Sequence, residues 1–394
     1  MTGATHTAGR ALGIRRRGAK AAARPKPPLE RSLLQTATLC LLALGVVMVF
    51  SASSTTSLLG ESGDGAFFVK RTLLFGAIGL AVMHGLALGG LRWIRIATPA
   101  ILIGSIGLLF LVLLPGFGVE ANGATRWLAA GPIQLQPSEI AKLALIFYGA
   151  SLLAKRPRTV ASIGEMTPYL LVTGLVGGLI LIEPDLGTAL VATFAVSALL
   201  IAGGAQIRHL LLIGAVITIF ALLAILIEPY RQDRITGFLN PSSDAGGAGF
   251  QGTQATIALG SGGLFGVGLG ESVQKAFYLP EAHTDMIAAV IGEEVGLLGL
   301  AVVVGLYGLF GYGGFRIAQR AKDRYGKLLA AGLTAMILAQ ATLNLFAVLG
   351  LAPLTGVPLP FVSYGNSNLI IMLAAVGVIL NVSRTSVGEP GRAG

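Results

Sequence analysis

The sequence is poor in charged residues, cysteine and histidine. Asp, Glu, Lys and Arg make up only 12% of its 394 residues and hydrophobic residues make up 54%, a composition that excludes a soluble domain of this length. The single cysteine, Cys40, excludes an intrachain disulfide, and with no histidine nearby it is a poor metal ligand or nucleophile. The Gly-rich run 246–270 lacks the Gly-Lys-Ser/Thr ending of a phosphate-binding loop, so it predicts no nucleotide site.

Long apolar runs dominate what is present. Runs of about 18 residues or more recur along the sequence, and each is long enough to cross a bilayer as a helix. Alternating segments typical of a membrane barrel are missing. We therefore predict an all-α polytopic membrane protein with about ten transmembrane helices. The predicted helices are 33–50, 67–88, 97–114, 138–153, 168–182, 188–202, 210–227, 285–309, 328–349 and 368–382.

The basic residues indicate the orientation in the membrane. Of the 28 Lys and Arg residues, 21 fall in the tails and loops of one side, which the positive-inside rule makes cytoplasmic. This accounts for the net charge of +10 without a nucleic-acid partner. We predict a basic, disordered cytoplasmic tail at 1–31 rather than a signal peptide, a transmembrane domain at 32–383 and a second cytoplasmic tail at 384–394. A large extracytoplasmic loop, 229–284, separates the seventh and eighth helices and carries the entrance to the active site.

The stretch that ends this loop holds an acid at the membrane boundary. Asp285 lies where the eighth helix is predicted to begin, with Pro280 in the first helical turn. An acid there is either part of a functional site or a cap stabilised by the helix dipole, and the residues alone leave both open. On such a helix Glu293 lies about 12 Å along the axis from Asp285, too far for a carboxylate pair. Glu293 and Glu294 are therefore predicted to pair with groups inside the bundle.

This stretch also carries a family resemblance. The segments Leu279-Pro-Glu-Ala-His-Thr-Asp285 and Ile291-Gly-Glu-Glu-Val-Gly296 resemble the signature of the SEDS family (shape, elongation, division and sporulation), which includes FtsW and RodA. Three more segments resemble its motifs in the expected order: Arg126-Trp127 with Gln136-Pro-Ser-Glu139, Glu183-Pro-Asp-Leu-Gly-Thr188, and Pro358-Leu-Pro-Phe-Val-Ser-Tyr-Gly365.

The long loop resembles FtsW more than RodA, which remains the close alternative. The segments closer to FtsW are Pro229-Tyr-Arg231, Phe238-Leu-Asn-Pro241, Leu259-Gly-Ser-Gly-Gly263, Ser272-Val-Gln-Lys275 and, in the first helix, Phe50-Ser-Ala-Ser53. Two positions depart from most relatives: Gly365-Asn-Ser-Asn368, where two glycines and small hydroxyl residues are usual, and Met286, where an aromatic residue is usual.

The resemblance implies a peptidoglycan glycosyltransferase of the bacterial cytoplasmic membrane. Its substrate would be lipid II, the undecaprenyl-pyrophosphate-linked disaccharide peptide, polymerised into β-1,4 glycan strands on the extracytoplasmic side, in cell division or cell-shape elongation. Asp285 would be the general base. The partners would be a class B penicillin-binding protein, which is a transpeptidase, and other divisome or elongasome proteins. Two other functions stay open: a lipid II flippase, which needs polar groups through the full membrane depth, and a non-catalytic division scaffold, for which Asp285 is dispensable.

The chemistry of such a transfer names further candidates. A pyrophosphate leaving group needs cations and the acceptor hydroxyl needs a base, so one carboxylate with basic residues suffices. The predicted substrate-binding residues are Arg126, Trp127, Lys142, Arg231, Arg234, Lys275, Glu281, His283, Ser363 and Tyr364. The predicted structural residues are Gln136, Ser138, Glu139, Glu183, Asp185, Glu293 and Glu294. For Lys142, a structural salt bridge with Glu139 is an equal alternative to substrate binding. For Arg231 and Arg234, the equal alternative is that they are solvated charges of the loop. We predict no metal site built by the protein, while Mg²⁺ or Mn²⁺ held with the substrate pyrophosphate stays open.

Overall fold

The structure is a computed structural model that describes residues 28–60, 63–121, 124–131, 133–227, 229–240, 248–276 and 278–386. Of the two predicted tails, only residues 28–31 and 384–386 fall within these ranges, and the rest of each tail lies outside them. The elements are α1 (Leu29–Leu59), α2 (Phe67–Leu88), α3 (Leu91–Leu113), β1 (Gly118–Ala121), β2 (Ala124–Ala130), β3 (Ile133–Leu135), α4 (Pro137–Lys155), the 3-10 helix η1 (Pro157–Val160), α5 (Ile163–Ile182), α6 (Leu186–Gly203), α7 (Ile207–Ile227), α8 (Pro229–Leu239), α9 (Ala248–Gly262), α10 (Ile287–Glu294), α11 (Gly296–Arg320), α12 (Arg324–Val348) and α13 (Asn366–Ser386).

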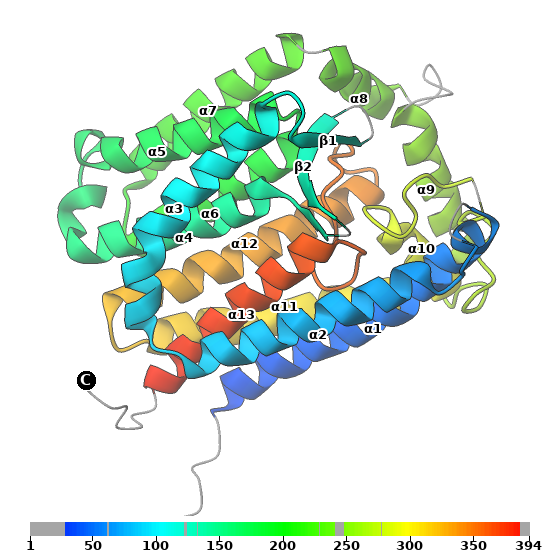
Figure 1. Ribbon diagram of the computed structural model, residues 1–394, viewed down its shortest axis with the longest axis horizontal. Coiled ribbons are helices and arrows are strands. Elements are labelled where there is room, and N and C mark those ends of the chain that lie inside the picture. Colours follow the sequence, from blue (N-terminus) through cyan, green and yellow to red (C-terminus); the bar gives the residue numbers. More distant parts are fainter. Residues whose placement is uncertain are drawn as a thin grey trace, which may run out of the picture.

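Ten helices of the described residues are long and apolar enough to span a membrane: α1 to α7 and α11 to α13. The predicted all-α, ten-helix membrane architecture is therefore confirmed. The spans run roughly side by side (Figure 1), with α8, α9, α10 and the strands gathered at one end of the bundle, which we call the loop end. The start of α1 and the end of α13 lie at the opposite end.

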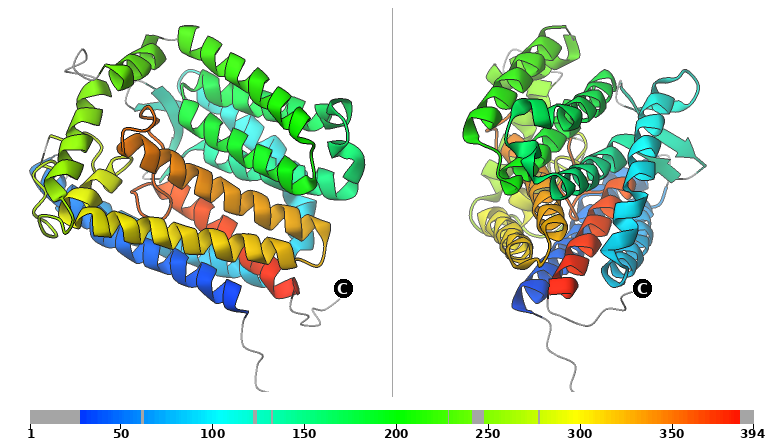
Figure 2. Two further views of the ribbon diagram at one scale, coloured as in Figure 1. Left: turned by 180° about the vertical axis from the view of Figure 1, so that it is seen from behind. Right: turned by 90° about the vertical axis from the view of Figure 1, so that its left-hand side faces the viewer.

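The spans differ sharply in how deeply they are enclosed. The apolar window of α13 is 89% buried inside the bundle, whereas none of the window of α7 is buried. Figure 2 shows α7 at the rim of the bundle, away from α1 and α11. A helix that is apolar all round and unburied by protein is suited to contact lipid on most of its surface.

Several helices extend beyond the apolar runs that predicted them. The first helix begins at Leu29 and continues through Ser51 to Leu59, and the third begins at Leu91 rather than in the residues after Arg95. Hydropathy marks the part of a helix that meets lipid, and polar helical turns beyond the lipid carry no such signal.

The segment predicted as a loop between the third and fourth helices contains an antiparallel sheet. Its strand order is β1-β2-β3, with Val119 opposite Trp127 and Leu128 opposite Leu135. These strands are too short for an alternating pattern to be recognised in the sequence. The sheet gives Arg126 and Trp127 a fixed backbone at the loop end.

The prediction of one helix over 285–309 is wrong. Residues 280–286 form turns, α10 begins only at Ile287, and the helix breaks where Gly296 takes a φ of +74°. A Cβ on Gly296 would stand 2.4 Å from the Gly266 N atom, so only glycine allows the run 263–268 to pass this closely. Hydropathy cannot detect this break, because the apolar pattern continues across it.

The run 263–268 also satisfies the backbone groups that the break leaves free. Leu297 N donates to Gly263 C=O at 2.9 Å, and Val267 N donates to Glu293 C=O at 2.9 Å. Helix ends carry unpaired N–H and C=O groups, which are costly away from water. The Gly-rich run therefore serves as a backbone partner for the broken helix.

A buried ion pair fixes the next part of the loop to the same place. Lys275 Nζ lies 2.7 Å from Glu294 Oε1 and 3.1 Å from Ser51 Oγ, and both residues of the ion pair are buried. Glu293 accepts hydrogen bonds from Ser272 Oγ and, at 3.1 Å, from Val273 N. The two acids thus join α1, α10 and the long loop.

Replacing Lys275 by methionine should destabilise the fold strongly. Removing one partner of a buried ion pair leaves the other charge uncompensated, at a cost of about 3–5 kcal/mol. The measurement is the unfolding temperature of the purified protein in detergent. The control is the double variant Lys275→Met/Glu294→Gln, which removes both charges and should regain most of the loss. A Lys275→Met protein as stable as the wild type would contradict this role of the pair.

Candidate active site

Asp285 lies in the turns that precede α10, at the loop end of the bundle. Its backbone carbonyl accepts a 2.7 Å hydrogen bond from Asn344 Nδ2 of α12, and the same amide donates to Val357 C=O at 2.8 Å. Asn344 therefore ties Asp285 to the segment 349–365 that links α12 and α13. The sequence analysis missed Asn344, although a buried amide in an apolar span is itself a signal of a special role.

The Asp285 carboxyl group is buried and its acidity is weakened. Only 8% of the residue is exposed. Burial and, second, the nearby Glu281 carboxylate raise the pKa of Asp285 to about 7, while the Arg234 guanidinium acts in the opposite direction. A carboxyl group with such a pKa exchanges protons near neutral pH, as a general base must.

A glycine separates this carboxylate from a guanidinium. Gly356 has a φ of +71°, and a Cβ built on it would lie 3.9 Å from Asp285 Oδ2 and 3.8 Å from Arg234 Nη1. Arg234 Nη1 donates to Leu354 C=O at 2.7 Å, which fixes the guanidinium beside the same segment. Because Gly356 has no side chain, the position of its missing Cβ is empty. An atom of a ligand placed there would contact both the Asp285 carboxylate and the Arg234 guanidinium.

Arg126 reaches the site from β2. Its Nε donates to Glu183 C=O at 3.0 Å and its Nη2 donates to Pro184 C=O, in the turn between α5 and α6. Asp185 holds this turn, since Oδ1 caps Thr188 N at 2.9 Å and Oδ2 accepts from Gln136 Nε2 at 2.9 Å. The structure thus brings together two of the sequence motifs.

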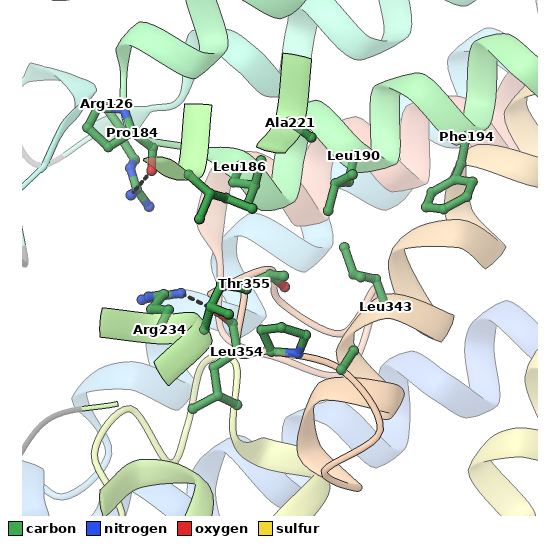
Figure 3. A pocket seen from close by; sticks show the side chains of 14 residues that line it. Arg126, Pro184, Leu186, Leu190, Phe194, Ala221, Arg234, Leu343, Leu354 and Thr355 are labelled. Atoms are coloured by element: carbon green, nitrogen blue, oxygen red, sulfur yellow. Dashed lines mark hydrogen bonds between the residues drawn. The ribbon is translucent and has the colours of Figure 1, made fainter. Parts of the chain in front are cut away.

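A cavity of about 320 Å³ has Arg126 and Arg234 in its wall. In Figure 3 the two arginines lie at one end and Phe194 and Leu343 at the other. The rest of the wall is almost entirely apolar and comes from α6, α7, α8, α12 and the segments next to them. A cavity with cations at one end and apolar walls suits a ligand with an anionic group and a long apolar body.

An aromatic cluster supports the turn that carries Asp285. The rings of His283, Phe68 and Tyr364 pack against one another, with the His283 centroid 4.3 Å from Phe68 and 5.6 Å from Tyr364, and Phe68 4.9 Å from Tyr364. Tyr364 N donates to His283 C=O at 2.9 Å. Burial lowers the pKa of His283. Ser363 Oγ accepts from Leu359 N at 2.8 Å in the neighbouring turn. The sequence analysis missed Phe68, because an aromatic residue at the start of an apolar helix carries no distinct signal.

Glu281 lies in the same turns as Asp285 and near its carboxyl group. Thr284 Oγ1 donates to Glu281 Oε2 at 2.7 Å, and Glu281 has a φ of +54°. Its carboxylate is the charge that helps to raise the pKa of Asp285. Among the predicted substrate-binding residues, Glu281 and Arg234 are thus the two that act on Asp285 directly.

Other predicted residues lie elsewhere. Lys142 is buried in the bundle, where its Nζ contacts Glu139 Oε1 and Gln340 Oε1, each at 2.8 Å, and Asn368 Nδ2 donates to Glu139 Oε2 at 2.8 Å. Ser138 is also buried in α4, and Trp127 is half-buried on β2. The backbone of Arg231 lies in α8, but its side chain is outside the described part of the structure. Within the described ranges, no three His, Cys, Asp or Glu side chains come together to hold a metal ion.

Comparison with known proteins gives consistent matches. A family model described as cell cycle protein, covering FtsW, RodA and SpoVE, matches residues 31–387. The protein is 41% identical over 345 residues to the probable peptidoglycan glycosyltransferase FtsW of Trichlorobacter lovleyi, covering 87% of this sequence and 90% of that protein. It is also 41% identical over 355 residues to stage V sporulation protein E of Bacillus subtilis, covering 90% of this sequence and 97% of that protein.

Solved structures share the fold. One of them, from a study of the coordination of polymerization and crosslinking by a peptidoglycan synthase complex, superposes with a TM-score of 0.74 at 30% identity, covering 90% of this protein and 98% of the matched one. The rod shape determining protein RodA of Thermus thermophilus superposes with a TM-score of 0.67 at 31% identity, covering 90% and 97%.

Removing the Arg234 guanidinium should raise the pKa of Asp285 above its value of about 7, because that cation favours the ionised carboxylate. The test is an infrared titration of the Arg234→Met variant, with the Asp285 band assigned by its loss in Asp285→Asn. Arg126→Met is the matched control and should leave the pKa of Asp285 unchanged. An unchanged or lowered pKa in Arg234→Met would contradict the geometry of the site.

Proposed function

The protein belongs to the family that groups FtsW, RodA and SpoVE, and from that premise we propose that it polymerises lipid II into β-1,4 glycan strands with Asp285 as general base. It is a multi-pass membrane protein and a peptidoglycan glycosyltransferase that acts in cell division or cell shape. The observation that supports the base is the buried Asp285 carboxylate facing Arg234 beside Gly356, next to the apolar cavity.

Lipid II has the chemistry that this site suits. Its isoprenoid tail is long and apolar, its pyrophosphate is anionic, and its sugars carry the reacting hydroxyl group. The apolar walls between α6, α7 and α12 suit the tail, and the two arginines suit the pyrophosphate. Because the apolar window of α7 is unburied, a lipid tail can approach this part of the bundle from the membrane.

The proposed reaction is a single displacement. The ionised Asp285 carboxylate takes the proton of the acceptor sugar hydroxyl, and the hydroxyl oxygen forms a bond to the anomeric carbon of the donor. The bond from that carbon to the pyrophosphate oxygen breaks with inversion, and undecaprenyl pyrophosphate leaves with the bonding electrons. Arg234 and Arg126 stabilise the charge on the leaving group. A good anionic leaving group needs no second carboxylate as an acid, so it is no obstacle that Glu293 is engaged by Ser272 and Val273.

The location follows from the same proposal. We place the protein in the bacterial cytoplasmic membrane, with the loop end on the extracytoplasmic side and both termini in the cytoplasm. The basic residues Arg156, Arg158, Arg320 and Arg324 then lie on the cytoplasmic side, as the positive-inside rule expects.

A transpeptidase partner completes the proposal. A structural neighbour belongs to a peptidoglycan synthase complex that combines polymerization with crosslinking. We propose that this protein likewise works with a class B penicillin-binding protein, within the division or elongation machinery. Polymer synthesis should therefore be measured with the partner present and absent, and repeated with a chelator to test the role of Mg²⁺ or Mn²⁺.

Replacing Asp285 by asparagine should reduce polymerisation of lipid II by ~10²–10⁴-fold, since asparagine keeps the shape but accepts no proton. The wild-type rate should rise with pH through about 7, because the base works only when ionised. The measurement is the amount of glycan polymer formed per unit time, with the strands resolved by length on gels. The control is Asp64→Asn, which should keep full activity. Asp64 lies in the loop between α1 and α2, where its Oδ2 pairs with Nζ of the exposed Lys70 at 2.7 Å. Full activity in Asp285→Asn would exclude the proposed base.

Gly356→Ala should impair catalysis beyond its effect on stability. Gly356 and Gly350 have φ values of +71° and +69°, so alanine at either position costs about 1–3 kcal/mol of strain. Around Gly350 a Cβ meets open space, whereas at Gly356 it enters the space beside Asp285 and Arg234. We expect similar unfolding temperatures for the two variants, but a ~10²-fold lower kcat/KM for Gly356→Ala alone, because the methyl group occupies space that we propose a reacting atom of the substrate needs. Equal activity of the two variants would argue against the open space as the reaction site.

A further inference from the structure

Glu183 is a buried acid without a hydrogen-bond partner. It ends α5 as the C-cap residue and is 1% exposed. Across the described residues, neither of its buried carboxylate oxygens has a hydrogen-bond partner. Buried polar groups are nearly always hydrogen-bonded, and a buried ionised carboxylate without donors is far costlier than a neutral one.

On balance, burial and the neighbouring charges favour the neutral form of Glu183. Burial and, second, the neighbouring Asp185 carboxylate raise the pKa of Glu183 to about 8, while the Arg126 guanidinium acts in the opposite direction. Asp185 is already engaged by Thr188 N of α6 and Gln136 Nε2. Asp185 and Arg126 are the charged groups that act on Glu183 from the elements packed around it.

Arg126 bonds to the backbone of Glu183 but not to its carboxylate. Its hydrogen bonds run from Nε to Glu183 C=O at 3.0 Å and from Nη2 to Pro184 C=O. Figure 3 shows the second of these bonds. Carbonyl groups orient a guanidinium without neutralising its charge. Since Arg126 lines the cavity together with Arg234, its remaining N–H donors are available to an anion there.

We infer that Glu183 serves as a neutral, protonated side chain, and that its neutrality leaves the charge of Arg126 to the pyrophosphate of the substrate. Glu183 is thus a positioning residue that acts through Arg126, and the inference rests on the proposed function of the cavity. When Glu183 loses its proton, the new carboxylate competes with the substrate for Arg126. Substrate binding then weakens while the chemistry at Asp285 continues.

The first test is the pH dependence of lipid II polymerisation by the full-length protein with its transpeptidase partner, from about pH 6 to about pH 9. In the wild type, KM should rise as pH passes about 8, with kcat little changed. Glu183→Gln keeps the shape and fixes the neutral state, so it should keep the neutral-pH KM and lose the alkaline rise. A glutamine variant with the same alkaline rise in KM, or with a higher KM at neutral pH, would overturn the inference.

The second test does not depend on activity. Infrared difference spectra at neutral pH should show the C=O stretch of a protonated carboxylic acid that disappears with a pKa of about 8. The band should be absent from Glu183→Gln and present in Asp285→Asn. Lack of this band in the wild type would overturn the inference, even if polymerisation proceeds. If the wild type makes no polymer at any pH, the proposed function fails instead, while the spectra still report the state of Glu183.

Discussion

Backbone polar groups at membrane depth need partners within the protein, and this requirement organises the loop end of the molecule. The eighth apolar run breaks at Gly296, which frees backbone groups on both sides of the break. The Gly-rich run 263–268 supplies their partners, and Lys275 and Ser272 then bind the two acids that end α10. With α10 fixed in this way, the turns before it hold the buried Asp285 against α12, where Asn344 binds its backbone carbonyl.

The cations near the loop end divide into two kinds by what holds them. Lys142 and Lys275 are buried against the carboxylates of Glu139 and Glu294. The first pair lies within α4 and is linked to α12 through Gln340, and the second joins the long loop to α10. Arg126 and Arg234 line the cavity and donate to backbone carbonyls, which set the direction of each guanidinium, and Arg234 also lies near the Asp285 carboxylate. The first kind of contact serves packing of the bundle. The second leaves positive charge at the cavity, where we propose that the substrate pyrophosphate binds.

Much of the architecture follows from hydropathy and charge. The ten spans and their order are visible in the sequence because each must match the bilayer thickness. Asp285 was identified because an acid at the membrane boundary stands out, and the family motif drew attention to the same residue. The broken helix, the small sheet, the role of Gly356 and the two carbonyl partners of Asn344 could not be predicted. Each depends on what another segment places beside it, such as Gly266 against Gly296, and no local pattern records that.

Asn344 has a mechanical consequence for the site. One side-chain amide donates to the carbonyls of both Asp285 and Val357, and Val357 follows directly on Gly356. Asp285, the proposed base, and the segment that faces it are therefore hydrogen-bonded to the same residue of α12. A tilt of α12 would therefore pull on both segments at once, and would change their height relative to the lipid surface more than the spacing between them.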